Sequence, residues 1–358
     1  MTTSTPGQVA TDVLFSADSH IMEPVDLWKT RVPAALRDAA PLFPPHKVGQ
    51  GFQALAGGWD PRERQKEMAQ DGISAEVLYP TLGLSLFGMD DARLQEACFA
   101  AYNDWLAEYC AFAPERLLGI ATISTYDIDN AVAELERAAK AGLRGALVWQ
   151  TPHPDLRFST DHYDKLWDAA QSMDMSISLH ILTGHGYSKE MFERIGSGAP
   201  SVGVDHYKNS VNTKNFEIAN AILELIFTGA LERYPQLKVV IVENEAGWLP
   251  FTLQQWDYYY NRFRTRNPMP MEMMPSEYFA RQCYATFFKD AVGGQEFEFW
   301  GQDQCMWSND FPHENSTWPH SRQVIADTLG HLSQDVRTKL LRTNAERLFS
   351  VRIPDATP

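Results

Sequence analysis

Acidic and imidazole side chains stand at three places where a short, β-rich apolar run ends. Asp18 and His20 close the first run, His180 ends the run SISLH, and Asp310 follows the last run. An extended chain points residues two apart to the same side, so Asp18 and His20 can bind one ion together. Two imidazoles and two carboxylates suit Zn²⁺, and Mn²⁺ or Fe²⁺ can also use them. The four residues therefore predict a site for one divalent cation, with Zn²⁺ expected first and Mn²⁺ second.

These side chains can meet only if the runs become neighbouring strands. Eight strands are expected, and stretches of helical periodicity separate them, most clearly Asp129–Ala141 and Asn215–Tyr234. Alternating β and α elements predict an α/β fold, a (β/α)8 barrel whose active site lies at the carboxyl ends of the strands. A doubly wound open sheet is the alternative, but SADSHIMEP after the first strand is no glycine-rich phosphate loop. The expected strands are Val13–Asp18, Ala75–Tyr79, Leu118–Ser124, Ala146–Gln150, Ser176–Ile181, Val239–Glu243, Tyr284–Phe288 and Cys305–Ser308.

Two segments interrupt the alternation within what we expect to be one domain over residues 1–358. Residues 25–65 are rich in Pro, Gly and Trp, and residues 183–214 carry several glycines. Long loops in compact domains are often lids or binding loops. We expect both insertions to border the active site, and surface excursions without a role are the alternative.

Composition excludes several classes of partner. The formal net charge of −15 disfavours nucleic acid and anionic membrane surfaces, which bind clustered Lys and Arg. No apolar run approaches the ~18 residues of a membrane span. The N-terminal residues lack the basic and apolar regions of a signal peptide, and the four cysteines form no CxxC pair. We therefore expect a cytoplasmic homo-oligomer that acts on a small molecule.

The segments FSADSHIMEPVDLW, EVLYPT, SLHILTG, VENEAGWLP and WSNDFPHENSTWP resemble the amidohydrolase superfamily. The resemblance is specifically to the amidohydrolase-related branch that contains aminocarboxymuconate-semialdehyde decarboxylase, and it covers nearly the whole chain. It implies a (β/α)8 barrel with one catalytic divalent metal. The implied ligands are again Asp18, His20, His180 and Asp310.

Two positions separate this chain from members of that branch. Many members open with HxH, whereas this chain has Asp18-x-His20, which is similar to the aromatic-acid decarboxylases. Those decarboxylases also place a His after the sixth strand, where this chain has Glu243, Asn244 and Glu245. We expect Glu243 or Glu245 to take a catalytic role, and a buried salt-bridge partner is the alternative for Glu243.

Other side chains near the strand ends are candidates for substrate contact or support. His185 is a candidate acid or substrate contact, with a mobile surface residue as the alternative. Glu23 is expected to hydrogen-bond a ligand imidazole, and His313 to support its loop, with a hydrogen bond to Asp310 as the alternative. The two arginines of DPRERQ are expected on a solvated helix face, with a substrate-carboxylate anchor as the alternative. These arginines are Arg62 and Arg64. Candidates for an aromatic pocket are Trp59, Trp149, Trp248 and Trp318, with core positions as the alternative for Trp149 and Trp248.

A bound divalent cation lowers the pKa of its water to near neutrality, and Asp310 can accept the proton as general base. The sequence therefore favours hydrolysis of a small cyclic or aromatic carbonyl compound. The alternative is non-oxidative decarboxylation of an aromatic or unsaturated acid, in which protonated Asp310 delivers a proton to carbon. The opening Asp-x-His favours that alternative and the missing His after the sixth strand opposes it. A metal-free binding barrel is a third hypothesis, and the intact ligand set argues against it.

Overall fold

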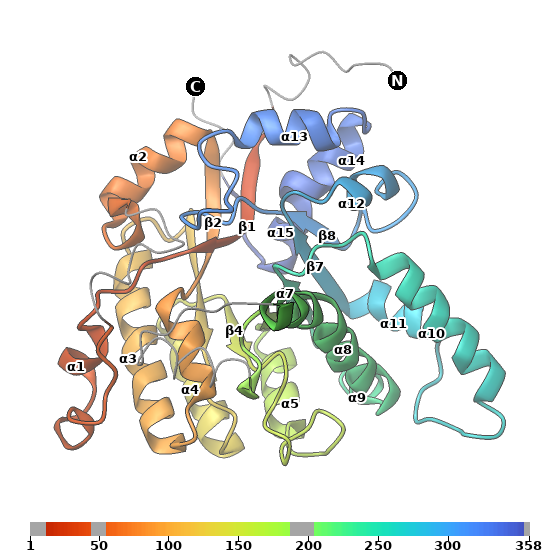
Figure 1. Ribbon diagram of the computed structural model, residues 1–358, viewed down its shortest axis with the longest axis horizontal. Helices are drawn as coiled ribbons and strands as arrows, with labels where there is room; N and C mark the ends of the chain where they lie inside the picture. The colour runs from red at the N-terminus through yellow and green to blue at the C-terminus, as the bar shows by residue number, and fades with distance from the viewer. Residues whose placement is uncertain (1–11, 44–54, 187–203, 354–358) are drawn as a thin grey trace.

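The fold is an eight-stranded parallel barrel surrounded by helices (Figure 1). The computed structural model describes residues 12–43, 55–186 and 204–353. The strand order in the sheet follows the chain from β1 to β8, and each strand pairs in parallel with the next one. The expected (β/α)8 architecture is confirmed. The strands are β1 Leu14–His20, β2 Ile73–Tyr79, β3 Leu117–Thr122, β4 Gly145–Val148, β5 Ser176–His180, β6 Val239–Val242, β7 Cys283–Phe287 and β8 Cys305–Trp307.

Helical elements fill the connections between these strands. Longer helices cover the barrel wall, and short turns lie in the insertions. The elements up to β5 are α1 Leu27–Arg31, η2 Ala34–Leu36, η4 Ala56–Gly58, α2 Pro61–Asp71, η5 Leu82–Gly88, α3 Ala92–Cys110, α4 Ile128–Lys140 and α5 Asp164–Ser172. Those after β5 are α7 Val204–Val211, η6 Asn212–Glu217, α8 Ile218–Phe227, α9 Ala230–Arg233, α10 Leu249–Phe263, α11 Pro275–Gln282, α12 Ala291–Glu296, α13 Ser321–Leu329, α14 Gln334–Thr338, η7 Lys339–Thr343 and α15 Asn344–Leu348.

The two helices expected from periodicity have different outcomes. α4 matches its expected range within one residue at each end, and Asp127 begins it by accepting hydrogen bonds from the backbone amides of Asp129 and Asn130. The expected helix Asn215–Tyr234 is instead divided into the π-helical turn η6, α8 and α9. Gly229 separates α8 from α9, because its φ of +74° is a left-handed conformation that ends the helix. A Cβ at this position would also lie 2.4 Å from the Pro270 carbonyl oxygen.

The first strand ends two residues later than expected, because β1 runs on to His20 and therefore contains Asp18 and His20. Its register with β2 shifts between Ser16 and Ser19. Such a bulge re-aims side chains relative to strict alternation. Of the two expected insertions, positions 44–54 and 187–203 lie outside the described residues. Within the described part, no helix is long and apolar enough to cross a membrane.

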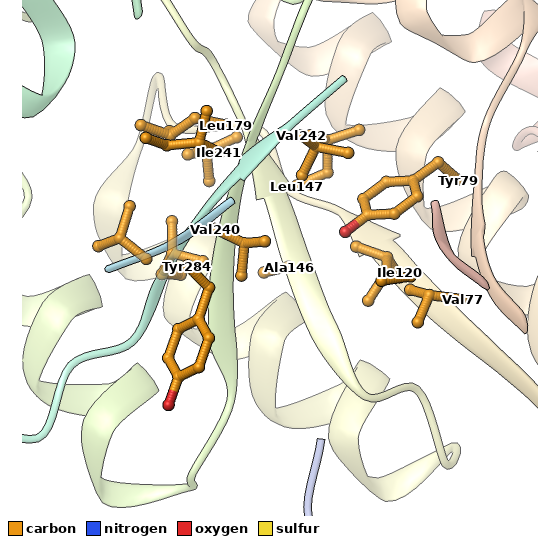
Figure 2. Close-up of a cluster of buried hydrophobic side chains, with 14 of the residues drawn as sticks. Val77, Tyr79, Ile120, Ala146, Leu147, Leu179, Val240, Ile241, Val242 and Tyr284 are labelled. Atoms are coloured by element: carbon orange, nitrogen blue, oxygen red, sulfur yellow. The ribbon is translucent and has the colours of Figure 1, made fainter. Parts of the chain in front are cut away.

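Apolar side chains of the strands form the core on which the site rests (Figure 2). Leu179 on β5 pairs in register with Ile241 on β6, and both are fully buried. One polar contact crosses the barrel lower down, where the Tyr79 hydroxyl lies 3.0 Å from Ser178 Oγ. Ser178 precedes His180 by two residues on β5, so this contact lies beneath the ligand-bearing end of the strand.

Leu179→Ala should lower the free energy of unfolding by about 2–5 kcal/mol, because it leaves a cavity in this core. Asp127→Ala, which removes only the cap of an exposed helix terminus, should lower it by about 1 kcal/mol. Urea denaturation of the two variants and the parent protein measures both. A smaller loss for Leu179→Ala than for Asp127→Ala would contradict the described packing.

Candidate active site

The four residues singled out by the sequence lie together at the carboxyl ends of three strands. We call Asp18, His20, His180 and Asp310 the ligand cluster. His20 Nε2 lies 3.5 Å from Asp18 Oδ1 and 3.6 Å from Asp310 Oδ1, and His180 Nε2 lies 3.7 Å from Asp18 Oδ1. These separations are at or beyond the limit for hydrogen bonds. They fit atoms that each lie about 2.0–2.2 Å from one shared cation.

The facing atoms of the ligand cluster are buried and lack hydrogen-bond partners among the described residues. They are both carboxylate oxygens of Asp18, Nε2 of His20, Nε2 of His180 and Oδ2 of Asp310. Buried polar atoms in native proteins are nearly always paired, and a buried charge without a partner is strongly unfavourable. A divalent cation is the group that would satisfy carboxylate oxygens and imidazole nitrogens at the same point.

Both imidazoles of the cluster are oriented from behind by backbone carbonyl groups. Nδ1 of His20 lies 2.7 Å from the Pro80 oxygen, and Nδ1 of His180 lies 2.7 Å from the Ile181 oxygen. A carbonyl oxygen only accepts, so each Nδ1 carries a proton and donates it. Each Nε2 therefore turns its lone pair toward the cluster, as a metal ligand requires.

Glu23 does not take this orienting role, and its expected hydrogen bond to a ligand imidazole is wrong. Its carboxylate accepts hydrogen bonds from the backbone amides of Thr81, Leu82 and Gly83, at 3.3, 2.9 and 2.9 Å. Burial raises the pKa of Glu23 to about 7, although these amides oppose the rise. Glu23 therefore holds the start of η5, directly after the carbonyl that orients His20.

Burial and mutual repulsion dominate the electrostatics of the site. Burial raises the pKa of Asp18, and burial together with the Asp310 carboxylate raises that of Glu243 to about 8. Burial, with the nearby His313 and His180 charges, lowers the pKa of His20 well below its ordinary value. For His180 burial also opposes the charge, but Asp18, Glu243 and the Ile181 carbonyl together outweigh it and raise the pKa to about 9. A bound cation favours ionised carboxylates and neutral imidazoles throughout such a cluster.

Glu243 joins the ligand cluster and Glu245 does not. Oε2 of Glu243 lies 3.7 Å from Nε2 of His180. Glu245 instead lies 3.6 Å from Nζ of Lys214 and accepts a hydrogen bond from the backbone amide of Phe288. Of the two acidic residues left open by the sequence, only Glu243 is placed where it can act on the same centre.

Two histidines outside the ligand cluster have different surroundings. His313 Nδ1 lies 2.8 Å from Asp310 Oδ1, and its ring lies 4.0 Å from that of His20. The contact with Asp310, which the sequence left as the alternative, is therefore the one formed. His185 Nε2 instead lies 3.1 Å from Asp90 Oδ1, and its ring is 4.6 Å from that of His153. His185 therefore does not lie among the side chains whose ligand atoms could share one metal ion at the site.

Arg64 corrects a second expectation, because it is fully buried and does not lie on a solvated helix face. Its Nε lies 2.5 Å from Glu76 Oε2, Nη1 donates to the His20 carbonyl at 2.7 Å, and the guanidinium lies 4.4 Å from the Phe311 ring centre. Arg64 therefore supports the backbone of a cluster residue and does not anchor a substrate. Arg62 is exposed, as expected, 5.7 Å from the Phe112 ring.

Sequence reasoning missed Asn309, which joins the first strand of the barrel to the segment after the last strand. Its backbone amide donates to Ser16 Oγ at 2.9 Å, and its side-chain oxygen accepts from Ser19 Oγ at 2.8 Å and from the Phe311 amide at 3.1 Å. The serines that alternate with Asp18 and His20, and the Asn before Asp310, were the available signal.

The four tryptophans that the sequence offered for an aromatic pocket have different surroundings. Three use their indole N–H on backbone carbonyls, and Trp149 is part of the core as the alternative held. Trp59 is 46% exposed. The three hydrogen bonds are Trp149 to Phe87, Trp248 to Asn244 and Trp318 to Glu67.

Glu76→Gln should lower the free energy of unfolding by about 3–5 kcal/mol, because it leaves the Arg64 guanidinium buried without its counter-charge. The double variant Arg64→Met/Glu76→Leu should recover most of that loss, since apolar side chains often replace a buried pair at little cost. Urea denaturation measures both. The exposed Arg31–Glu108 pair, with 2.7 Å between its nearest atoms, is the control, and Glu108→Gln should lose no more than about 1 kcal/mol. An equal loss at the two pairs would contradict the described burial of Arg64.

Solved structures share this barrel. An amidohydrolase from Mycobacterium avium subsp. paratuberculosis K-10 superposes on 94% of this chain and 99% of its own chain, with a TM-score of 0.74 and 18% identity. A dihydroxybenzoic acid decarboxylase from Polaromonas sp. JS666 superposes on 95% of this chain and 97% of its own chain, with a TM-score of 0.69 and 21% identity. That structure holds manganese and the inhibitor 2-nitroresorcinol.

Sequence relatives extend over most of the chain. A gamma-resorcylate decarboxylase from Polaromonas sp. (strain JS666 / ATCC BAA-500) is 26% identical over 80% of this chain and 86% of its own length. A second, from Rhizobium sp. (strain MTP-10005), is 26% identical over 89% of this chain and 95% of its own length. The family model described as Amidohydrolase matches residues 25–351. The resemblance expected from the motifs is confirmed, and the chain belongs to the amidohydrolase family of enzymes.

Proposed function

We propose that this protein is a metal-dependent, non-oxidative decarboxylase of hydroxylated aromatic acids. One observation carries the reaction: the chain matches two gamma-resorcylate decarboxylases over 86% and 95% of their lengths. The geometry of the ligand cluster supports the same reaction, because it supplies a cation site with a carboxylate, Asp310, at its edge.

The hydrolase favoured by the sequence is wrong. The two sequence relatives described above are decarboxylases, and so is the manganese-containing structural neighbour. The strand-end residues did not distinguish the two reactions, because a cation and a carboxylate able to exchange a proton serve both. The absence of a His after β6, which opposed the decarboxylase, does not outweigh these matches.

Asp18, His20, His180 and Asp310 would hold the cation, which fits their buried and unpaired ligand atoms. Mn²⁺ replaces the Zn²⁺ expected from the sequence as the proposed ion, because manganese is bound in the Polaromonas neighbour. When bound, the cation supplies positive charge that attracts the substrate carboxylate into an acidic site.

Asp310 is the proposed proton donor. Because a bound cation favours its ionised form, Asp310 must first take up a proton from solvent, which it then transfers to the ring carbon that carries the carboxylate. The bond between that carbon and the carboxylate then breaks, its electron pair restores the aromatic ring, and CO2 leaves. His313 lies 2.8 Å from Oδ1 of Asp310 and would orient the carboxyl group during the transfer. His185, a candidate acid in the sequence, has no role in this proposal because it lies with Asp90 and His153.

Incubation with gamma-resorcylate should release CO2 and resorcinol in equal amounts, and the activity should require about one equivalent of Mn²⁺ per chain. Removal of the ion by a chelator should abolish CO2 release, and added Mn²⁺ should restore it, because the substrate carboxylate then regains its counter-charge. Chromatography of the products and elemental analysis of the protein measure both. Full activity after complete removal of the metal would contradict the proposal.

Asp310→Asn should lower kcat for CO2 release by at least about 10²–10⁴-fold, because an amide cannot deliver the proton. The amide oxygen retains one weak ligand atom, so much of the bound Mn²⁺ should remain. Metal content measured on the same preparation separates loss of the proton donor from loss of the ion. Wild-type kcat in a fully loaded Asp310→Asn variant would show that another group donates the proton.

A further inference from the structure

We infer that Glu243 is a fifth protein ligand of the cation, so that the site consists of three carboxylates and two imidazoles. The inference rests on the proposed metal site and deepens it by adding a ligand and a preference among metals. It concerns the acidic turn after β6, where the sequence left the role of Glu243 open.

The carboxylates of Glu243 and Asp18 lie equally far from the imidazole of His180. Nε2 of His180 lies 3.7 Å from Oε2 of Glu243 and 3.7 Å from Oδ1 of Asp18. Ligand atoms of Glu243 also lie within 4.8 Å of those of Asp18, His20 and His180 in one group, and of those of His20, Asp310 and His313 in another. Glu243 and His20 are the members common to both groups, so the Glu243 carboxylate faces the point on which the ligand cluster converges.

The backbone directs this carboxylate inward. Glu243 has φ of +61° and Glu245 has φ of +57°, a left-handed conformation that residues other than glycine seldom adopt. Such conformations are strained and persist where surrounding contacts impose them, often at functional sites. Here the Glu243 amide donates to Thr286 Oγ1 at 2.8 Å, and Trp248 Nε1 donates to the Asn244 oxygen at 2.9 Å.

The charges around Glu243 call for a cation. Among the described residues its ion-pair contact is with His180, and ligand atoms of Asp18 and Asp310 lie within 4.8 Å of its own. A carboxylate packed beside two others, with its side chain only 17% exposed, is unfavourable unless a positive charge compensates it. Glu245, two residues away in the same turn, has such a charge in Lys214. Glu243 therefore has the surroundings of a ligand and Glu245 those of a salt-bridge partner.

A fifth ligand changes which metal the site prefers. Zn²⁺ is satisfied by four ligands in a tetrahedral arrangement, whereas carboxylate-rich sets with more ligands suit Mn²⁺. The Glu243 carboxylate should therefore contribute more to the affinity for Mn²⁺ than to the affinity for Zn²⁺.

Mn²⁺ titration of the metal-free full chain tests the inference without reference to catalysis. Electron paramagnetic resonance measures free Mn²⁺ during the titration, and the spectrum of the bound ion reports its ligands. Glu243→Gln should raise the Kd for Mn²⁺ by at least about 10–100-fold, the range that loss of even an indirect partner of a metal can reach. The spectrum of any bound ion should change, and the Kd for Zn²⁺, measured by competition, should rise less.

Glu245→Gln is the matched control, because it removes the same charge from the same turn and should leave the Kd for Mn²⁺ unchanged. Glu243→Asp keeps the charge on a shorter side chain and should give an intermediate Kd. Circular dichroism checks that each variant is folded. If Glu243→Gln does not fold, the Kd of Glu243→Asp for Mn²⁺ serves as the test.

Four results would overturn the inference or the proposals on which it rests, in distinguishable ways. An unchanged Kd and spectrum in folded Glu243→Gln would exclude a fifth ligand and leave the ligand cluster intact. An equal rise in Kd for Glu243→Gln and Glu245→Gln would show that only the net charge of the turn matters. A wild-type chain that binds no Mn²⁺ would overturn the metal site itself. A wild-type chain that binds Mn²⁺ but releases no CO2 would overturn the decarboxylase and leave the fifth ligand supported.

Discussion

Two backbone hydrogen bonds join the first strand to the chain that follows the last one, and the site depends on them. The Asp310 amide donates to the Asp18 carbonyl at 3.1 Å, and the His20 amide donates to the Phe311 carbonyl at 2.6 Å. Three residues of the ligand cluster thus supply backbone groups to the contact between β1 and the segment after β8. Their side chains converge because their main chains are already held together. In a barrel, this is the point where the first and last elements must meet.

A buried polar layer behind β1 supports the same contact. Arg64 from α2 pairs with Glu76 on β2 and donates to the His20 carbonyl, while Asn309 links Ser16 and Ser19 to the chain after β8. A buried ion pair contributes little net stability compared with apolar packing, because desolvation offsets its attraction. Its effect here is positional. It fixes the carbonyl, and so the backbone, of a cluster residue whose imidazole is fixed by Pro80 on its other side.

Local strain and local charge coincide at the site. Asp310 and Glu243 have φ of +55° and +61°, and both place carboxylates where acidic neighbours already lie. Neither feature is favourable in the chain alone, and a divalent cation offsets the second by pairing with several carboxylates at once. The formal net charge of −15 therefore does not exclude an anionic substrate, because a cation bound at the centre would set the field there more strongly than the distant surface does.

The sequence by itself determined the eight strands and the barrel, and it singled out four strand-end residues that the structure brings together, because strand periodicity and the position of strand ends are local properties of the chain. It could not determine the burial of Arg64 or the contacts of Glu23, since both depend on elements distant in the chain. Strict alternation would also have turned Glu243 and Glu245 to the same side. Only the tertiary structure separated them, because packing and hydrogen bonds hold two residues of that turn in the left-handed conformation. One carboxylate therefore faces His180 and the other faces Lys214.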